Sequence, residues 1–129
     1  MSAKFKYEKL TGTIIHCFYE VYNYLGYGFL ESVYENALKF RLMDNELEVK
    51  QQYPIPVFDG KRRQIGDFRA DLYVENKVLL ELKTTREISE IHKAQLLNYL
   101  KATHIEVGLL LNFGPEAKFR RLLFTNDKK

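Results

Sequence analysis

The chain contains only one cysteine, Cys17, among its 129 residues, so an intrachain disulfide is excluded. We expect Cys17 to be a small core residue on a helix. No cysteines and histidines occur at the spacing of a zinc site. The longest apolar run, residues 107–111, is far too short to cross a bilayer, and the first residues lack the apolar stretch of a signal peptide. These absences favour a cytoplasmic protein with no membrane partner.

The chain also lacks a large excess of charge of either sign, because 17 acidic residues nearly balance its 20 lysines and arginines and leave a net charge of +3. Such a mild excess suits a polyanionic partner without requiring one. Hydrophobic residues make up 46% of the chain and charged residues 29%, as in an ordinary globular protein. The length suffices for one core, and the sequence shows no repeat, low-complexity segment or linker. We therefore expect a single domain over residues 1–129.

Two stretches near the start show helical periodicity. Apolar residues recur at helical spacing over about 7–24 and again over about 30–45. Between the two stretches, Gly26 and Gly28 favour a turn. The apolar face of the second helix is assigned to Leu30, Val33, Tyr34, Ala37, Leu38 and Leu42.

Strands and one further helix follow. The patterning predicts strands over about 47–58, 64–74, 78–84 and 104–113, and a helix over about 89–102 with Ser89 as its cap. Two prolines, Pro54 and Pro56, favour either an edge position for the first strand or an irregular stretch. The last helix should cross over and make its two flanking strands parallel. The tail at 118–125 fits either a strand or a helix. One α/β domain with a mixed central sheet is expected.

The hairpin of the second and third strands gathers three charged residues. If its turn centres on Asn76, Asp71 faces Glu81, because each lies five residues from the centre. Lys83 lies two residues beyond Glu81 and therefore shares its face. A register slipped by one residue would divide the three between the two faces of the sheet.

This cluster has a chemical and a plainer interpretation. Two carboxylates about 5 Å apart repel by roughly 3 kcal/mol at an effective dielectric near 20. A divalent cation, usually Mg²⁺ where phosphate oxygens are also ligands, turns that repulsion into attraction. Lys83 then lies where it can orient or deprotonate a water or stabilise charge on a phosphate. On spacing alone, however, a half-exposed ion-pair cluster of little energetic worth is the favoured interpretation.

Polar residues on the helices extend the chemical hypothesis. Glu31 opens the second predicted helix, where it either reaches the sheet edge or is a surface acid favoured by the helix dipole. On the third helix, His92, Gln95 and Tyr99 form one polar stripe. Gln95 and Tyr99 are candidates to hold a phosphate or the attacking water, and a hydrogen-bonded helix flank explains the stripe equally well.

Basic residues gather at the first hairpin, beside the turn signal Asp59-Gly60. Lys61, Arg62 and Arg63 are candidate contacts to a phosphate backbone. Charge runs of this kind are more often simply solvated loops.

The segment 28–34 reads G-x-x-E-x-x-Y, and further blocks at 68–72, 81–83, 95–100 and 107–114 follow in order. Together these residues resemble the small bacterial and archaeal GxxExxY proteins, a branch of the PD-(D/E)XK nuclease superfamily. The resemblance covers nearly the whole chain. It implies a restriction-endonuclease-like core, consisting of a helix, a three-strand antiparallel meander, a crossover helix and a further strand. An extra helix precedes this core.

The resemblance also implies roles for individual residues. The expected metal ligands are Asp71 and Glu81, with Glu31 as an outer or second-metal ligand. Lys83 matches the catalytic lysine, and Gln95 matches the polar position on the second core helix. Alanine at position 70 replaces the proline of the superfamily's pattern, a minor departure because this position supplies backbone geometry rather than chemistry.

The function implied is that of a Mg²⁺-dependent endonuclease-type phosphodiesterase, with Mn²⁺ as a substitute ion. Its nucleic-acid partner is expected to be DNA ahead of RNA. Two alternatives fit the same fold. One is a catalytically inactive nucleic-acid-binding module, and the other is a protein-interaction subunit. The latter would form a homodimer through the tyrosines Tyr19, Tyr22, Tyr24 and Tyr27.

Overall fold

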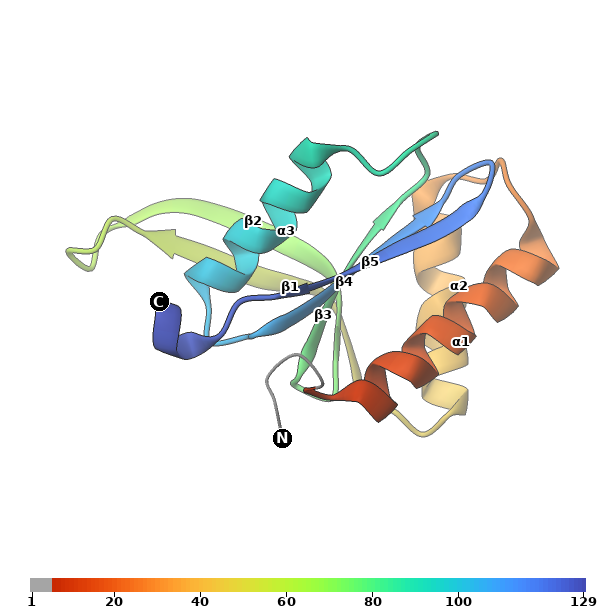
Figure 1. Ribbon diagram of the computed structural model, residues 1–129, viewed down its shortest axis with the longest axis horizontal. Helices are drawn as coiled ribbons and strands as arrows, with labels where there is room; N and C mark the ends of the chain where they lie inside the picture. Colours follow the sequence, from red (N-terminus) through yellow and green to blue (C-terminus); the bar gives the residue numbers. More distant parts are fainter. Residues whose placement is uncertain (1–5) are drawn as a thin grey trace.

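The computed structural model describes residues 6–129 and shows a five-stranded mixed sheet with helices on both faces (Figure 1). The helices are α1 (Glu8–Leu25), α2 (Glu31–Asp44) and α3 (Glu90–Ala102). The strands are β1 (Val49–Phe58), β2 (Gln64–Val74), β3 (Val78–Lys83), β4 (Val107–Phe113) and β5 (Ala117–Leu123). A short 3-10 helix at Asn126–Lys128 follows β5. No helix within residues 6–129 is long and apolar enough to pass through a membrane.

The strands lie in the order of the sequence, β1-β2-β3-β4-β5. All neighbours are antiparallel except β3 and β4, which α3 connects as a crossover and which run parallel, as predicted. The edge position of β1, predicted from Pro54 and Pro56, is confirmed. The tail that fitted a strand or a helix is strand β5, paired with β4.

The sheet separates two apolar cores. The larger core packs α1 and α2 against one face and contains Phe18, Leu80 and Phe113, which are all fully buried. Cys17 is buried in it as expected. The smaller core packs α3 against the opposite face. Figure 1 shows α1 and α2 together on one side and α3 on the other.

The apolar face assigned to α2 was partly wrong. Leu30 is 77% exposed and Val33 is 37% exposed, whereas Glu35 is only 8% exposed. Leu30 is the N-cap residue and lies just before the first residue of the helix. The helix is oriented so that Glu35 faces inward and Val33 does not. The buried residues of α2 are Tyr34, Glu35, Leu38 and Leu42.

Candidate active site

Strands β2 and β3 pair in the predicted register. Leu72 pairs with Leu80, so both partners lie four residues from Asn76. The backbone at Asn76 and its predecessor is left-handed, with φ of 52° and 54°, as a tight hairpin turn requires. The next position in this register brings Asp71 opposite Glu81.

At that position, hydrogen bonds from backbone N–H groups to side-chain carboxylates replace the regular backbone bonds between the two strands. The N–H of Asp71 donates to Oε1 of Glu81 at 3.1 Å. The N–H of Leu82 donates to Oδ2 of Asp71 at 2.7 Å. The two carboxyl groups are therefore held side by side, and each has a second oxygen that these bonds do not use.

Strand β1 is distorted beside Asp71. The ladder with β2 is interrupted at Gln52, whose φ of 53° lies in the left-handed region. Neighbouring residues on a regular strand point to opposite faces, yet the amides of Gln51 and Gln52 both donate to the carboxylate of Glu35. The left-handed backbone at Gln52 allows this convergence, so the strain is located where it organises the site.

Glu35 belongs to the cluster although its role was not predicted from the sequence. It accepts a hydrogen bond from Nε2 of Gln52 at 3.0 Å, and its nearby charge contributes to the raised pKa of Asp71. It follows Glu31 by one helical turn, so both acids project from one side of α2. The sequence did contain a signal for this role, because Glu35 lies four residues after Glu31 and between Tyr34 and Leu38, which are both buried.

Burial and mutual repulsion oppose ionisation of these carboxyl groups. Glu81 is 5% exposed, and burial followed by the charge of Asp71 raises its pKa to about 8. Burial also raises the pKa of Asp71 to about 6, with Glu35 and Glu31 adding to the effect. The pKa of Glu31 is raised by burial as well, against the opposing effect of Lys83. The site thus holds more acid groups than its one lysine can balance.

The interpretation as a half-exposed ion-pair cluster is wrong. Glu81 is buried, and within residues 6–129 no salt bridge joins Lys83 to a carboxylate. Lys83 and Glu81 alternate along β3 with Leu80 and Leu82 of the larger core, so they point toward α3. The charge of Lys83 lowers the pKa of Glu81 from nearby without a direct contact.

The loop after Lys83 is fixed by Asn112, which is fully buried on β4 next to Lys83. Its Oδ1 accepts the N–H of Thr85 at 3.0 Å, and its Nδ2 donates to the carbonyl of Thr85 at 2.9 Å. A Cβ at Gly114 would lie 2.0 Å from the same carbonyl, so only glycine fits there. Sequence patterning marked Asn112 merely as the end of a strand.

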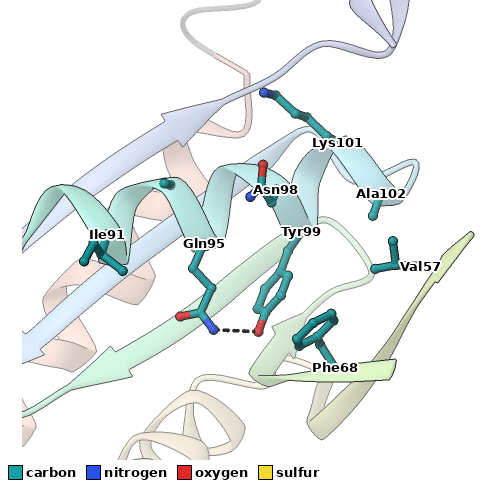
Figure 2. Close-up of a pocket in the computed structure, with 9 residues that line it drawn as sticks. Val57, Phe68, Ile91, Gln95, Asn98, Tyr99, Lys101 and Ala102 are labelled. Carbon is teal, nitrogen blue, oxygen red and sulfur yellow. Dashed lines mark hydrogen bonds between the residues drawn. The ribbon is translucent and has the colours of Figure 1, made fainter. Parts of the chain in front are cut away.

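The residues of the polar stripe on α3 have two different structural roles. Nε2 of Gln95 donates to the hydroxyl of Tyr99 at 3.0 Å (Figure 2). The pKa of Tyr99 is raised by burial and then by the charge of Glu81, which places this pair beside the carboxyl groups. His92 instead caps the helix, because its Nδ1 accepts the N–H of Ser89 at 3.2 Å. Burial and the charge of Lys83 lower the pKa of His92.

Lys61, Arg62 and Arg63 lie at the tip of the β1–β2 hairpin. Arg63 precedes Asp71 by eight residues, which corresponds to roughly 26 Å along an extended strand. Nε of Arg63 contacts Oδ2 of Asp59 at 2.6 Å, which braces the loop. The structure therefore does not bring these basic residues to the carboxyl cluster.

The tyrosines proposed for dimerisation differ in exposure, and a homodimer through them stays a prediction. The hydroxyl of Tyr22 donates to the carbonyl of Gly114 at 2.7 Å, so this side chain supports the fold. Tyr24 and Tyr27 are 79% and 59% exposed.

Asp71 and Glu81 fit a cation that keeps several water ligands. Within residues 6–129 no three Asp, Glu, His or Cys side chains converge closely enough to hold a metal on their own. Glu31, expected as a further ligand, affects the pKa of Asp71 but completes no such group. One or two carboxylates together with water and phosphate oxygens are the usual ligands of Mg²⁺. The raised pKa values show that ionisation of this pair is unfavourable without a nearby positive charge.

Comparison with known proteins gives one family match and one informative structure. Residues 8–122 match the model of the PD-(D/E)XK nuclease superfamily, whose members usually use divalent metals. No curated protein matches the chain. The chain is similar to the crystal structure of SSO0001, with 25% identity and a TM-score of 0.56. The match covers 76% of this chain and 52% of that one, so this chain spans about half the length of that structure.

These matches and the mixed sheet agree on a restriction-endonuclease-like fold with an additional N-terminal helix. Because the family model spans most of the chain, the protein belongs to the PD-(D/E)XK nuclease superfamily.

Proposed function

We propose that this protein is a metal-dependent nuclease that hydrolyses phosphodiester bonds in DNA, with RNA as the alternative substrate. The observation that carries the proposal is the pair of cross-strand hydrogen bonds that holds Asp71 and Glu81 together next to Lys83. Bringing the buried Glu81 and the half-buried Asp71 together costs folding free energy, which is expected where the pair serves binding. Membership of a nuclease superfamily supports the reaction class.

Each residue has a proposed role. Asp71 and Glu81 hold Mg²⁺, or Mn²⁺ in its place, which supplies Lewis-acid activation of a water and of the phosphate when bound. Lys83 orients the attacking water and stabilises charge on the phosphate. Glu31 and Glu35 add negative charge that favours a cation over a bare phosphate. Gln95, held by Tyr99, orients the phosphate.

We also propose that the chain belongs to the GxxExxY branch. The motif residues have separate structural tasks that support this. Gly28 has a φ of 119°, which favours glycine. Tyr34 donates to the carbonyl of Gly26 and stacks on Phe113, with ring centroids 4.4 Å apart. Gly28 and Tyr34 together fix the conformation of the turn that precedes Glu31, the first residue of α2.

The test is cleavage of plasmid and single-stranded DNA with Mg²⁺ or with EDTA. Lys83→Ala should lower the rate roughly 100- to 1,000-fold. Lys9→Ala, which removes an exposed lysine on α1, is the matched control and should cut like the wild type. Equal rates for Lys83→Ala and the wild type would remove Lys83 from the mechanism. Salt-sensitive binding that Mg²⁺ and Asp71→Ala leave unchanged, without cleavage, would instead identify an inactive binding module.

A further inference from the structure

A groove of about 700 Å³ lies between α3 and the β1–β2 hairpin (Figure 2). Phe68 and Val57 form its strand side, and Ile91 and Tyr99 form its helix side. The rings of Phe68 and Tyr99 lie with their centroids 5.8 Å apart and their planes tilted by 40°. Phe68 is 46% exposed and Ile91 is 79% exposed, so the groove has apolar walls open to solvent. Its volume lies within the range of small-ligand sites, about 300–1,000 Å³.

Polar groups line one side of this groove. Gln95 uses its amide N–H to bond Tyr99, which leaves its carbonyl oxygen as an acceptor. Asn98, one helical turn later, is exposed and offers both a donor and an acceptor. Amide side chains of this type match the hydrogen-bonding edges of nucleobases. An aromatic wall beside amide groups is therefore suited to a flat, polar-edged ring.

Strand β2 and helix α3 link the groove to the candidate active site. Phe68 precedes Asp71 by three residues on β2, roughly 10 Å of strand. Tyr99 and Gln95 lie in the groove and also next to the carboxyl groups. Lys83 supplies positive charge for a phosphate at the active-site end of this path.

We propose that this groove binds an unpaired nucleobase of the strand whose phosphate lies at Asp71 and Glu81. This inference rests on the proposed nuclease function and names its substrate class as single-stranded or locally unpaired nucleic acid. A base within a duplex has both faces covered by stacking, so it enters a concave aromatic groove only after leaving the stack. Stacking on aromatic side chains is the usual way in which proteins hold single strands.

The test measures binding of a fluorescent single-stranded DNA, and of the same sequence as a duplex, by anisotropy in EDTA. Phe68→Ala should weaken single-strand binding about 5- to 100-fold and leave duplex binding nearly unchanged. Phe68→Trp should restore single-strand binding, whereas Phe68→Leu, which is apolar but cannot stack, should not. Phe40→Ala is the matched control, because Phe40 is 56% exposed on α2 and lies outside the groove.

The outcomes separate the two proposals. Lys83-dependent cleavage together with unchanged single-strand binding by Phe68→Ala would overturn the groove and leave the nuclease proposal standing. Phe68-dependent single-strand binding without any cleavage would support the groove and count against the nuclease. If Phe68→Leu binds as well as the wild type, the groove recognises apolar bulk rather than a base. A change of oligomeric state in Phe68→Ala without DNA would assign the groove to a second copy of the chain and overturn the inference.

Discussion

The two faces of the sheet differ in how completely they are covered. Two helices close one face, and the core there, which includes Phe18 and Tyr34, is entirely buried. A single helix covers the other face and leaves Phe68 and Ile91 exposed beside a groove. The carboxyl cluster lies between the two sides, where the regular pairing of β2 and β3 gives way to side-chain bonds and where Glu35 of α2 also acts on Asp71.

This difference indicates a division of tasks. Apolar burial on the closed face supplies most of the folding free energy. This stability compensates for the acidic cluster and for the left-handed backbone of Gln52 beside it.

A cavity on the closed face should have the largest effect on stability. Phe18→Ala removes a fully buried ring that contacts Phe113 edge-on at 4.8 Å, and should lower the free energy of unfolding by about 3–5 kcal/mol. Ile91→Ala on the open face should change it by less than about 0.5 kcal/mol. Denaturant unfolding measures both values. Similar losses in the two variants would contradict the division between the faces.

The buried acids should make stability depend on pH. The pKa values of Asp71 and Glu81 are raised to about 6 and about 8, so the folded state binds more protons than the unfolded chain between about pH 4 and pH 8. The stability present below pH 4 is lost as the pH rises through this window. We expect a loss of roughly 2–4 kcal/mol between pH 5 and pH 8 from these groups.

Glu81→Gln should remove most of this pH dependence and be more stable than the wild type at pH 8, while cutting DNA poorly. Added Mg²⁺ should stabilise the wild type at pH 8, because the cation binds the ionised pair. It should not stabilise Glu81→Gln to the same extent. Calorimetry at both pH values reports these effects without relying on cleavage. A wild type that is more stable at pH 8 than at pH 5 would refute the assignment.

The smallest effects are expected at Glu46 and Gln52, two residues whose backbone is left-handed. Glu46 follows α2 with a φ of 62° and is exposed, whereas Gln52 adjoins the site. Glu46→Gly should stabilise the fold by roughly 0.5–1 kcal/mol without changing cleavage. Gln52→Gly relieves similar strain but removes a donor to Glu35, so cleavage should fall by about tenfold. Equal cleavage rates for Glu46→Gly and Gln52→Gly would show that Gln52 does not organise the site.

Much of the fold was predictable because local rules determine it. Periodicity located the helices and strands, prolines marked the edge strand, and the parity of one hairpin predicted the register of Asp71 and Glu81. The rotation of α2 was not predictable in the same way. Neighbouring apolar residues allow several faces, and only packing against the sheet selects the one that buries Glu35.

The sequence by itself thus determined which residues face each other along one hairpin, since side-chain alternation and turn position are local properties. Only the tertiary structure decided that Glu35, Gln52 and Asn112 surround that hairpin, because their positions follow from contacts between distant segments. It also decided that Glu81 is buried and shares no salt bridge with Lys83, so the pair is not a surface cluster. The groove beside Tyr99 exists for the same reason, because one helix is too narrow to cover its face of the sheet.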